Sequence, residues 1–204
     1  AARTSAVVAD AAATEADTLA ALDPMIRLPL AELCFPVLRL RHPAEQGRVR
    51  ETVNALIYAD GMLTAFEYCL SRLLHRELYE SVHHAPPWPV RRRTLAGSRD
   101  AVGTLLAVLA DAGHTDPGAA ARAFTAGLAQ VIPEWQVGYF PPAQGVVALD
   151  AVWPALDGLA PPEKARLVAG LATVVGHDGE ATVAEVELLR MICGVLHCPL
   201  PLPA

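Results

Sequence analysis

Asp60-Gly61-Met62-Leu63-Thr64-Ala65-Phe66-Glu67 and Asp178-Gly179-Glu180-Ala181-Thr182-Val183-Ala184-Glu185 share the pattern D-G-x-x-T-x-x-E at a separation of 118 positions. Extending the comparison without a gap pairs residues 31–78 with residues 149–196, and twelve of these 48 positions are identical. An internal match at a fixed offset is typical of a duplicated structural unit. We therefore expect two like segments with equivalent turns at Asp60 and Asp178.

Apolar residues recur at intervals of three and four on both sides of each phrase, which predicts a helix, a tight Asp-Gly turn and a second helix. Gly61 and Gly179 suit a position with positive φ after a helix end. Thr64-x-x-Glu67 and Thr182-x-x-Glu185 have the spacing of capping boxes. The positions expected to be buried are Val49, Val53, Leu56, Ile57, Phe66, Leu70, Leu73, Leu74 and Leu78, with Leu167, Leu171, Val174, Val175, Ala184, Leu188, Met191, Ile192 and Leu196 as their counterparts.

The pattern between the repeats is also helical, and no stretch shows sustained alternation of β-branched residues, so we predict an all-α fold: two helical repeats with an intervening helical pair. Residues 1–22 are Ala-rich and predict a helix, and residues 23–80 and 146–204 hold the two repeats. Each repeat has a further short helix before it, at Leu33–Leu40 and Ala151–Gly158. Residues 81–145 hold loops and the helical pair. Ser98 is expected to cap a helix reaching about Ala112, and Asp116-Pro117 to open one reaching about Val131.

Composition limits the class of protein. With 204 residues, 53% of them hydrophobic, the chain can bury a substantial core. A net charge of −6 argues against nucleic acid as a partner. The apolar run at 101–110 is half of what spans a bilayer, so we expect no transmembrane segment here. The sequence has no initiator Met and no signal-peptide pattern, and we expect a fragment or a processed chain. The four Cys lack CxxC spacing, which favours buried reduced thiols over a disulfide or a metal site.

The A-D-G-x-x-[ST]-x-x-E phrase at a helix–helix turn resembles the TerB-like helical domain. The likeness extends to the C-terminal extension of bacterial membrane-bound zinc metallopeptidases, relatives of the CAAX prenyl proteases, and covers residues 22–204. It is carried by Leu22-Asp23-Pro24, Leu28-Pro29-Leu30-Ala31-Glu32-Leu33, Pro36-Val37-Leu38-Arg39, Ala55-Leu56-Ile57-Tyr58-Ala59-Asp60-Gly61, Phe66-Glu67-Tyr68, His177 to Glu185, and Cys198-Pro199-Leu200-Pro201.

The resemblance implies a peptidase as the parent protein, but this chain departs from the enzyme half. A zincin needs H-E-x-x-H, and no His here is followed by Glu. We therefore expect a non-catalytic interaction or regulatory domain, with no cofactor of its own and zinc only in the missing catalytic part. The expected partner is another protein or the peptidase domain of the same chain. The expected location is a soluble domain at the cytoplasmic face of the bacterial inner membrane.

An alternative function is a module that responds to a divalent cation. Asp60, Glu67, Asp178 and Glu185 match loop positions 5 and 12 of an EF-hand, and are the candidate metal ligands. The first two ligand positions of each loop are missing, because they hold Leu56 and Tyr58 in one copy and Val174 and Gly176 in the other. Turn and capping roles are therefore the favoured interpretation. An autonomous hydrolase is disfavoured, since no nucleophile–base pair or metal triad has recognisable spacing.

The segment His83-His84-Ala85-Pro86-Pro87-Trp88-Pro89-Val90-Arg91-Arg92-Arg93 is open to two interpretations. It suits a docking loop for an acidic partner or anionic lipid, with Trp88 as an interfacial anchor. It equally suits a surface loop whose Trp88 packs over the core, and three arginines are few for a lipid cluster. The second interpretation is favoured.

Overall fold

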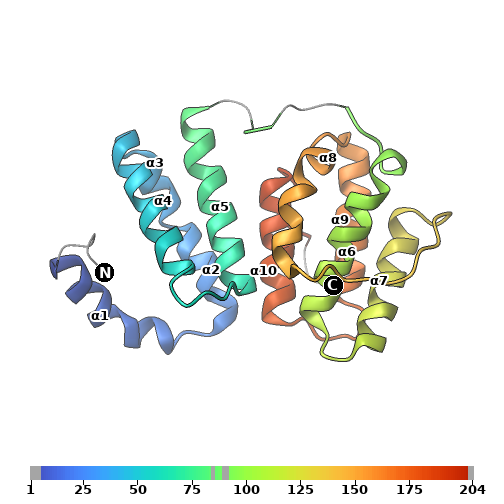
Figure 1. Ribbon diagram of the computed structural model, residues 1–204, viewed down its shortest axis with the longest axis horizontal. Helices are drawn as coiled ribbons and strands as arrows, with labels where there is room; N and C mark the ends of the chain where they lie inside the picture. The colour runs from blue at the N-terminus through green and yellow to red at the C-terminus, as the bar shows by residue number, and fades with distance from the viewer. Residues whose placement is uncertain (1–5, 84–85, 89–91, 202–204) are drawn as a thin grey trace. The chain divides into compact units, whose positions relative to one another are not determined.

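The computed structural model describes residues 6–83, 86–88 and 92–201, and confirms the all-α prediction for these residues. They contain helices and no strand, with an isolated bridge between Arg93 and Leu159. The chain divides into two compact units, residues 1–84 and 85–204 (Figure 1). The helical pair expected between the two repeats therefore belongs to the same unit as residues 146–204.

The first unit is organised around its last helix. It contains α1 (Ala6–Ala20), α2 (Pro24–Glu32), α3 (Phe35–Arg39), α4 (Pro43–Ile57) and α5 (Ala65–Val82). Helix α5 packs against α2, α3 and α4. The helix expected in residues 1–22 is present as α1, and its side chains at 7–20 are all exposed. Helix α2 was not predicted, because Pro29 interrupts its sequence pattern although it lies inside the helix.

The second unit has a three-helix core of α6, α7 and α9. Its elements are η1 (Ala96–Ser98), α6 (Arg99–Gly113), α7 (Pro117–Val131), η2 (Gly145–Ala151), α8 (Trp153–Asp157), α9 (Pro161–Val175) and α10 (Val183–Val195). Helices α6, α7 and α9 pack against one another, and α10 packs against α6 and α9. The apolar stripe predicted on the first helix of the intervening pair is fully buried: Val102, Leu105, Leu106 and Leu109.

Helices α3, α4 and α5 begin 118 positions before α8, α9 and α10, at 35, 43 and 65 against 153, 161 and 183. Both phrases form the predicted turn and cap, with φ of 76° at Gly61 and 83° at Gly179 and a complete capping box at Thr64 and at Thr182. Superposition of the two segments, and a common origin for them, stay predictions.

The two segments differ in how well their apolar stripes are covered. Leu167, Leu171 and Val174 of α9 are fully buried, as predicted. Leu56, the counterpart of Val174, is 70% exposed, so the prediction of burial was wrong there. Leu70 is half-buried rather than buried, whereas its counterpart Leu188 is fully buried. The physical reason is the set of neighbours: α9 is covered by α6, α7 and α10, while α4 packs mainly on α5.

Two glycines allow the close approach of α7 and α9. A Cβ at Gly127 would lie 2.9 Å from the carbonyl oxygen of Gly170, and a Cβ at Gly170 would lie 3.0 Å from the carbonyl oxygen of Gly127. Either Cβ would also collide with a valine side chain. Thr52 occupies the position in α4 that corresponds to Gly170. The threonine side chain leaves no room for another helix to pack against α4 as closely as α7 packs against α9.

The helix starts of the intervening pair differ in their caps. Asp116 caps α7 as predicted, since its Oδ2 accepts the N–H of Ala119 at 2.8 Å. Ser98 precedes α6 but does not cap it, so that prediction was wrong. Its φ and ψ of −118° and 24° lie outside the extended region that directs a cap hydroxyl toward the helix, because Ser98 also ends the 3₁₀ turn.

Among the described residues, none of the helices combines the length and the hydropathy that a membrane span requires.

Substituting Gly127 or Gly170 by Ala should destabilise the second unit by about 1–3 kcal/mol, because the new methyl group must push α7 and α9 apart. Gly47→Ala is the matched control, since Gly47 lies within α4 and a Cβ there meets no atom within 4 Å. That change should stabilise by about 0.5–1 kcal/mol through helix propensity. Urea unfolding curves measure both effects. An equal gain of stability from all three substitutions would contradict the close packing.

Candidate functional site

The predicted ligands of the first phrase, Asp60 and Glu67, have local structural partners. Asp60 Oδ1 accepts the N–H of Met62 at 2.9 Å, which closes the turn. Glu67 Oε2 accepts the N–H and the hydroxyl of Thr64 at 2.9 and 2.7 Å, and Thr64 Oγ1 accepts the N–H of Glu67 at 3.3 Å. Both carboxylates therefore serve the turn and the cap.

The second phrase repeats these contacts, and its glutamate is buried. Asp178 Oδ1 accepts the N–H of Glu180 at 3.1 Å, and Glu185 Oε2 accepts from the N–H and the hydroxyl of Thr182 at 2.9 and 2.8 Å. The Glu185 side chain is only 1% exposed, because it lies against the end of α6. A Cβ on Gly113 would overlap the Glu185 carboxylate, with 2.1 Å to Oε1, so this approach requires a glycine.

His114, which the sequence did not single out, lies between the two carboxylates of the second phrase. Its side chain is 4% exposed, and Nδ1 lies 3.0 Å from the carbonyl oxygen of Ala110 and 3.9 Å from Glu185 Oε1. A carbonyl only accepts, so Nδ1 is the donor in this contact. Nε2 lies 3.7 Å from Asp178 Oδ2, and no described group forms a hydrogen bond with it.

Metal binding at these residues has limited support. The described part of the chain contains no group of three or more His, Cys, Asp and Glu side chains placed to hold a metal ion. Asp60 and Glu67 lie in one compact unit, and Asp178 and Glu185 in the other. Within the second unit, His114 Nε2 lies near the Asp178 carboxylate, and Glu185 faces the other nitrogen of the imidazole.

The first unit presents a row of exposed apolar side chains on α2 and α3, which we name the α2–α3 stripe. It consists of Ile26, Leu30, Leu33, Val37 and Leu40, with exposed fractions of 47, 39, 73, 55 and 88%. Leu33 and Cys34 join the two helices with right-handed helical dihedrals, so spacing by four and three keeps the row on one side. Leu28 and Phe35, on the other side, are buried. This segment is therefore apolar on two faces and covered on one.

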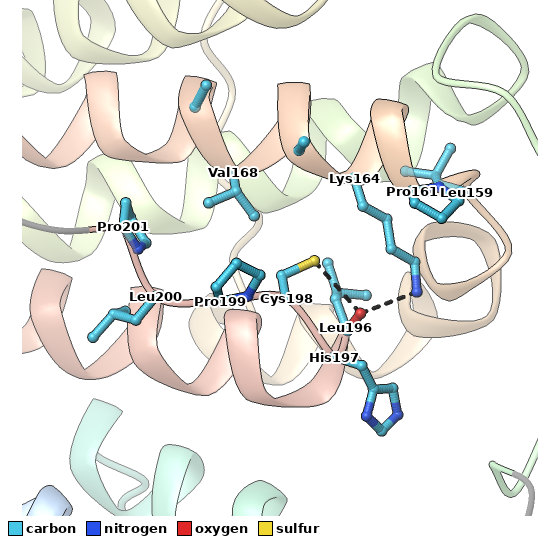
Figure 2. Close-up of a pocket in the computed structure, with 12 residues that line it drawn as sticks. Leu159, Pro161, Lys164, Val168, Leu196, His197, Cys198, Pro199, Leu200 and Pro201 are labelled. Carbon is cyan, nitrogen blue, oxygen red and sulfur yellow. Dashed lines mark hydrogen bonds between the residues drawn. The ribbon is translucent and has the colours of Figure 1, made fainter.

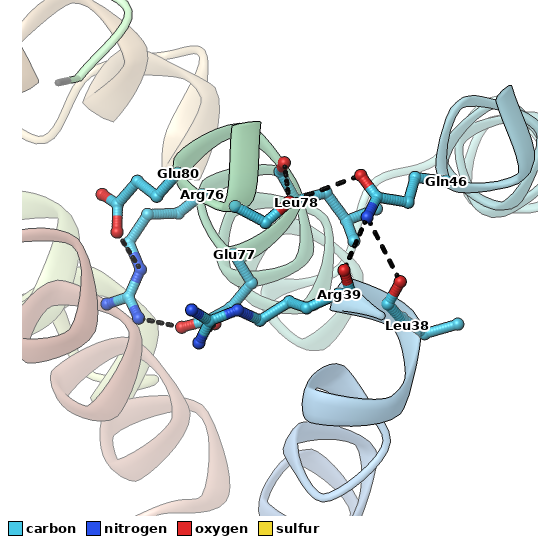
Figure 3. A network of polar contacts seen from close by, with 8 residues as sticks. Leu38, Arg39, Gln46, Arg76, Glu77, Leu78 and Glu80 are labelled. Atoms are coloured by element: carbon cyan, nitrogen blue, oxygen red, sulfur yellow. Dashed lines mark hydrogen bonds and ion pairs between the residues drawn. The ribbon is translucent and has the colours of Figure 1, made fainter. Parts of the chain in front are cut away.

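A polar network holds the end of α3 against α4 and α5. The side chain of Gln46, which is 6% exposed, donates to the carbonyl oxygens of Leu38 and Arg39 at 3.4 and 3.1 Å (Figure 3). It also donates to the carbonyl oxygen of Arg41 at 3.1 Å. Arg39 also pairs with Glu77 of α5 at 3.4 Å. Because these bonds satisfy carbonyls that the end of α3 leaves free, they fix the position of the stripe on its unit.

The second unit has a cavity of about 560 Å³ between α9 and residues 196–201 (Figure 2). Its lining is mostly apolar, with Lys164 at one end. Lys164 Nζ donates to Asp157 Oδ1 at 2.8 Å and to the carbonyl oxygen of Leu196 at 3.0 Å. The ammonium group is therefore largely occupied by protein acceptors.

The segment that suggested a docking loop is held to the same unit by Trp88. Its indole Nε1 donates to Asp157 Oδ2 at 3.2 Å, which favours the interpretation as a packed surface loop. His84, Pro89 and Arg91 of that segment lie outside the described residues. All four Cys are free. Cys69 and Cys193 are buried as expected, whereas the expectation was wrong for Cys34, which is exposed because it lies on the uncovered side of the α2–α3 junction.

Comparison of the chain with protein-family models, with curated proteins and with solved structures gives no match.

Proposed function

We propose that this chain is a non-catalytic helical interaction domain, and that the α2–α3 stripe is its binding surface. The stripe is the observation that supports the proposal most directly. Five large apolar side chains in a row, each at least 39% exposed, leave apolar area in contact with water. Covering such a patch is favourable by about 25 cal/mol for each Å² removed from water, and patches of this kind mark interaction sites.

The spacing of the stripe suits an α-helix as the partner element. Intervals of four, three, four and three place apolar side chains along the seam of two packed helices. Amphipathic helices bind such surfaces through anchors at the same intervals. We therefore infer that the partner presents the apolar face of a helix.

The charges next to the stripe favour a protein over a lipid surface. Helices that lie on anionic membranes need free Lys and Arg beside their apolar face. Here Arg39 pairs with Glu77, and Arg27 donates to the carbonyl oxygens of Ala20 and Leu22 at 3.1 and 3.2 Å. These two guanidinium groups already have partners within the unit, which leaves Arg41 as the only arginine of residues 24–41 without one among the described residues.

The resemblance to the tail of membrane-bound zinc metallopeptidases supplies the proposed parent. In that proposal the chain is the C-terminal part of such an enzyme at the cytoplasmic face of the bacterial inner membrane. The peptidase half holds the zinc, and the α2–α3 stripe binds a helix of that half. The full reading frame of the gene tests this parentage directly. It should contain H-E-x-x-H between apolar segments of about 20 residues, and a frame without that motif contradicts the parentage.

Leu33→Asp and Leu40→Asp should each weaken binding to the separately expressed remainder of the reading frame by tenfold or more, since burying a charge in an apolar seam costs well over 1.4 kcal/mol. Both residues are highly exposed, so the free chain should fold normally. Phe140→Asp is the matched control, because Phe140 is 81% exposed in the other unit. Calorimetric titration measures the affinities.

Equal affinity for all three variants and the unmodified chain would contradict the proposal. Two further measurements test whether the stripe instead binds a second copy of the chain or a membrane. Self-association in sedimentation that both leucine variants abolish would assign the stripe to a second copy of the chain. Flotation with anionic vesicles that both variants abolish would assign it to a membrane. Either result overturns the helix-binding proposal.

His114 favours a second candidate function, a response to a divalent cation. Its buried Nε2 has no hydrogen-bond partner among the described residues and faces Asp178. Imidazole nitrogen prefers zinc and related transition metals to calcium or magnesium. An ion held by Nε2 and the Asp178 carboxylate would complete its coordination with water. The first phrase has no such imidazole at its Asp-Gly turn among the described contacts.

We expect calcium and magnesium to leave the melting temperature unchanged, because hard cations need six or more oxygen ligands. If the second candidate is correct, zinc at 100 times its Kd should stabilise the chain by about 2.7 kcal/mol. Asp178→Asn should then abolish the gain and Asp60→Asn should preserve it. A gain that both variants lose equally, or that neither loses, contradicts a site at His114 and Asp178.

A further inference from the structure

Helix α10 ends in a motif that places two cysteines at adjoining positions. The N–H of Cys198 donates to the carbonyl oxygen of Cys193 at 2.9 Å, and the N–H of His197 donates to that of Gly194 at 3.1 Å. His197 between them has φ of 55°, the only positive value outside glycine among the described residues. These two bonds and the left-handed residue define a Schellman motif, whose first and last residues characteristically bring their side chains together. Here those residues are Cys193 and Cys198.

The backbone separation suits a disulfide. With 2.9 Å between Cys198 N and Cys193 O, standard bond lengths would place the two Cα atoms about 7.1 Å apart if all bonds were collinear. The true distance is shorter, because the bonds are not collinear, and disulfides span about 4.4–6.8 Å. The two thiols are also close enough to interact electrostatically. Burial first, and then the charge of Cys198, raise the pKa of Cys193 to about 12.

The two sulfurs differ in access. Cys193 is 2% exposed, whereas Cys198 is half-buried and lines the cavity beside α9 (Figure 2). Its thiol makes only a weak contact of 3.5 Å with the carbonyl oxygen of Leu196, so it can rotate. A small disulfide reagent therefore reaches Cys198 first, because Cys193 is buried.

We propose that Cys193 and Cys198 are a redox-sensitive pair that closes to an intramolecular disulfide. With glutathione disulfide as oxidant, the Cys198 thiolate attacks one glutathione sulfur and expels the other as a thiolate. The Cys193 thiolate then attacks the sulfur of Cys198, and the second glutathione thiolate leaves. Two protein thiols are oxidised, one glutathione disulfide is reduced to two thiols, and the two protons pass through solvent to the leaving thiolates.

The bond would fasten residues 196–201, one wall of the cavity, to the last turn of α10.

The pKa values of the two thiols determine how fast the disulfide forms. Burial raises the pKa of Cys198, although Lys164 opposes the shift, and the pKa of Cys193 is raised as well. Only thiolates react, so below these values the rate should rise about tenfold for each pH unit. This inference does not rest on the proposed interaction function.

Mass spectrometry after oxidation and alkylation tests the proposal on the full chain. Trypsin cleaves after Arg190 and no Lys or Arg follows, so both cysteines lie in one peptide, residues 191–204. After treatment with glutathione disulfide we expect this peptide to be two hydrogens lighter and to take up no alkylating reagent. Exposed Cys34, which should accept glutathione, reports that the oxidant was active. Alkylation or glutathione at both Cys193 and Cys198 while Cys34 reacts would overturn the proposal.

Two substitutions at His197 test whether the folded motif is responsible. Glycine adopts positive φ freely, so His197→Gly should oxidise at least as fast as the unmodified chain. Valine disfavours that conformation, so His197→Val should oxidise at least tenfold more slowly. Equal rates for the two variants would show that flexible-chain encounters, rather than the Schellman geometry, bring the thiols together.

Discussion

The capping box after each Asp-Gly turn is the contact on which both helical segments depend. In each, one glutamate oxygen accepts two hydrogen bonds from the cap threonine, at 2.7–2.9 Å, and fixes where the following helix begins. This role also explains the shared acidic residues without an ion. A carboxylate that satisfies the free N–H groups of a helix start has a structural function wherever the turn occurs.

The two helix–turn–helix segments differ in the helices that cover them, and this difference indicates where a binding surface can lie. In the second unit, Gly113 lets α6 lie against Glu185, and Gly127 and Gly170 let α7 lie against α9. The apolar faces of these helices are therefore buried in the core. In the first unit α4 lacks such a covering, Leu56 is 70% exposed, and the segment of α2 and α3 shows a second apolar face to solvent. An exposed apolar face is unusual on a surface helix, so the first unit is the one in which we propose a binding surface.

The sequence was sufficient for properties that depend on neighbours along the chain. The turn glycines, both capping boxes, the Asp116 cap and the α7 boundaries follow from local hydrogen bonding, and were predicted correctly. Burial of Leu56 was not, because periodicity identifies an apolar face but not whether another helix covers it. The α2–α3 stripe was missed for two reasons. Pro29 interrupts the sequence pattern of α2, and apolar residues on two faces of one segment do not show the periodicity of a single apolar face. His114 was missed because the carboxylates beside it lie more than 60 positions away in the sequence. The Cys193–Cys198 motif was missed because only a positive φ at His197 creates it.

Amide hydrogen exchange along residues 24–40 tests most directly whether the α2–α3 stripe is a binding surface. Exchange slows where a segment is protected by a bound partner. The measurement compares this chain alone with the same chain within the membrane-bound peptidase proposed as its parent, and α7 serves as the internal reference because its core contacts should not change. The account predicts exchange at least tenfold slower in residues 24–40 of the intact protein and unchanged exchange in α7. Equal exchange of residues 24–40 in the two samples would contradict it.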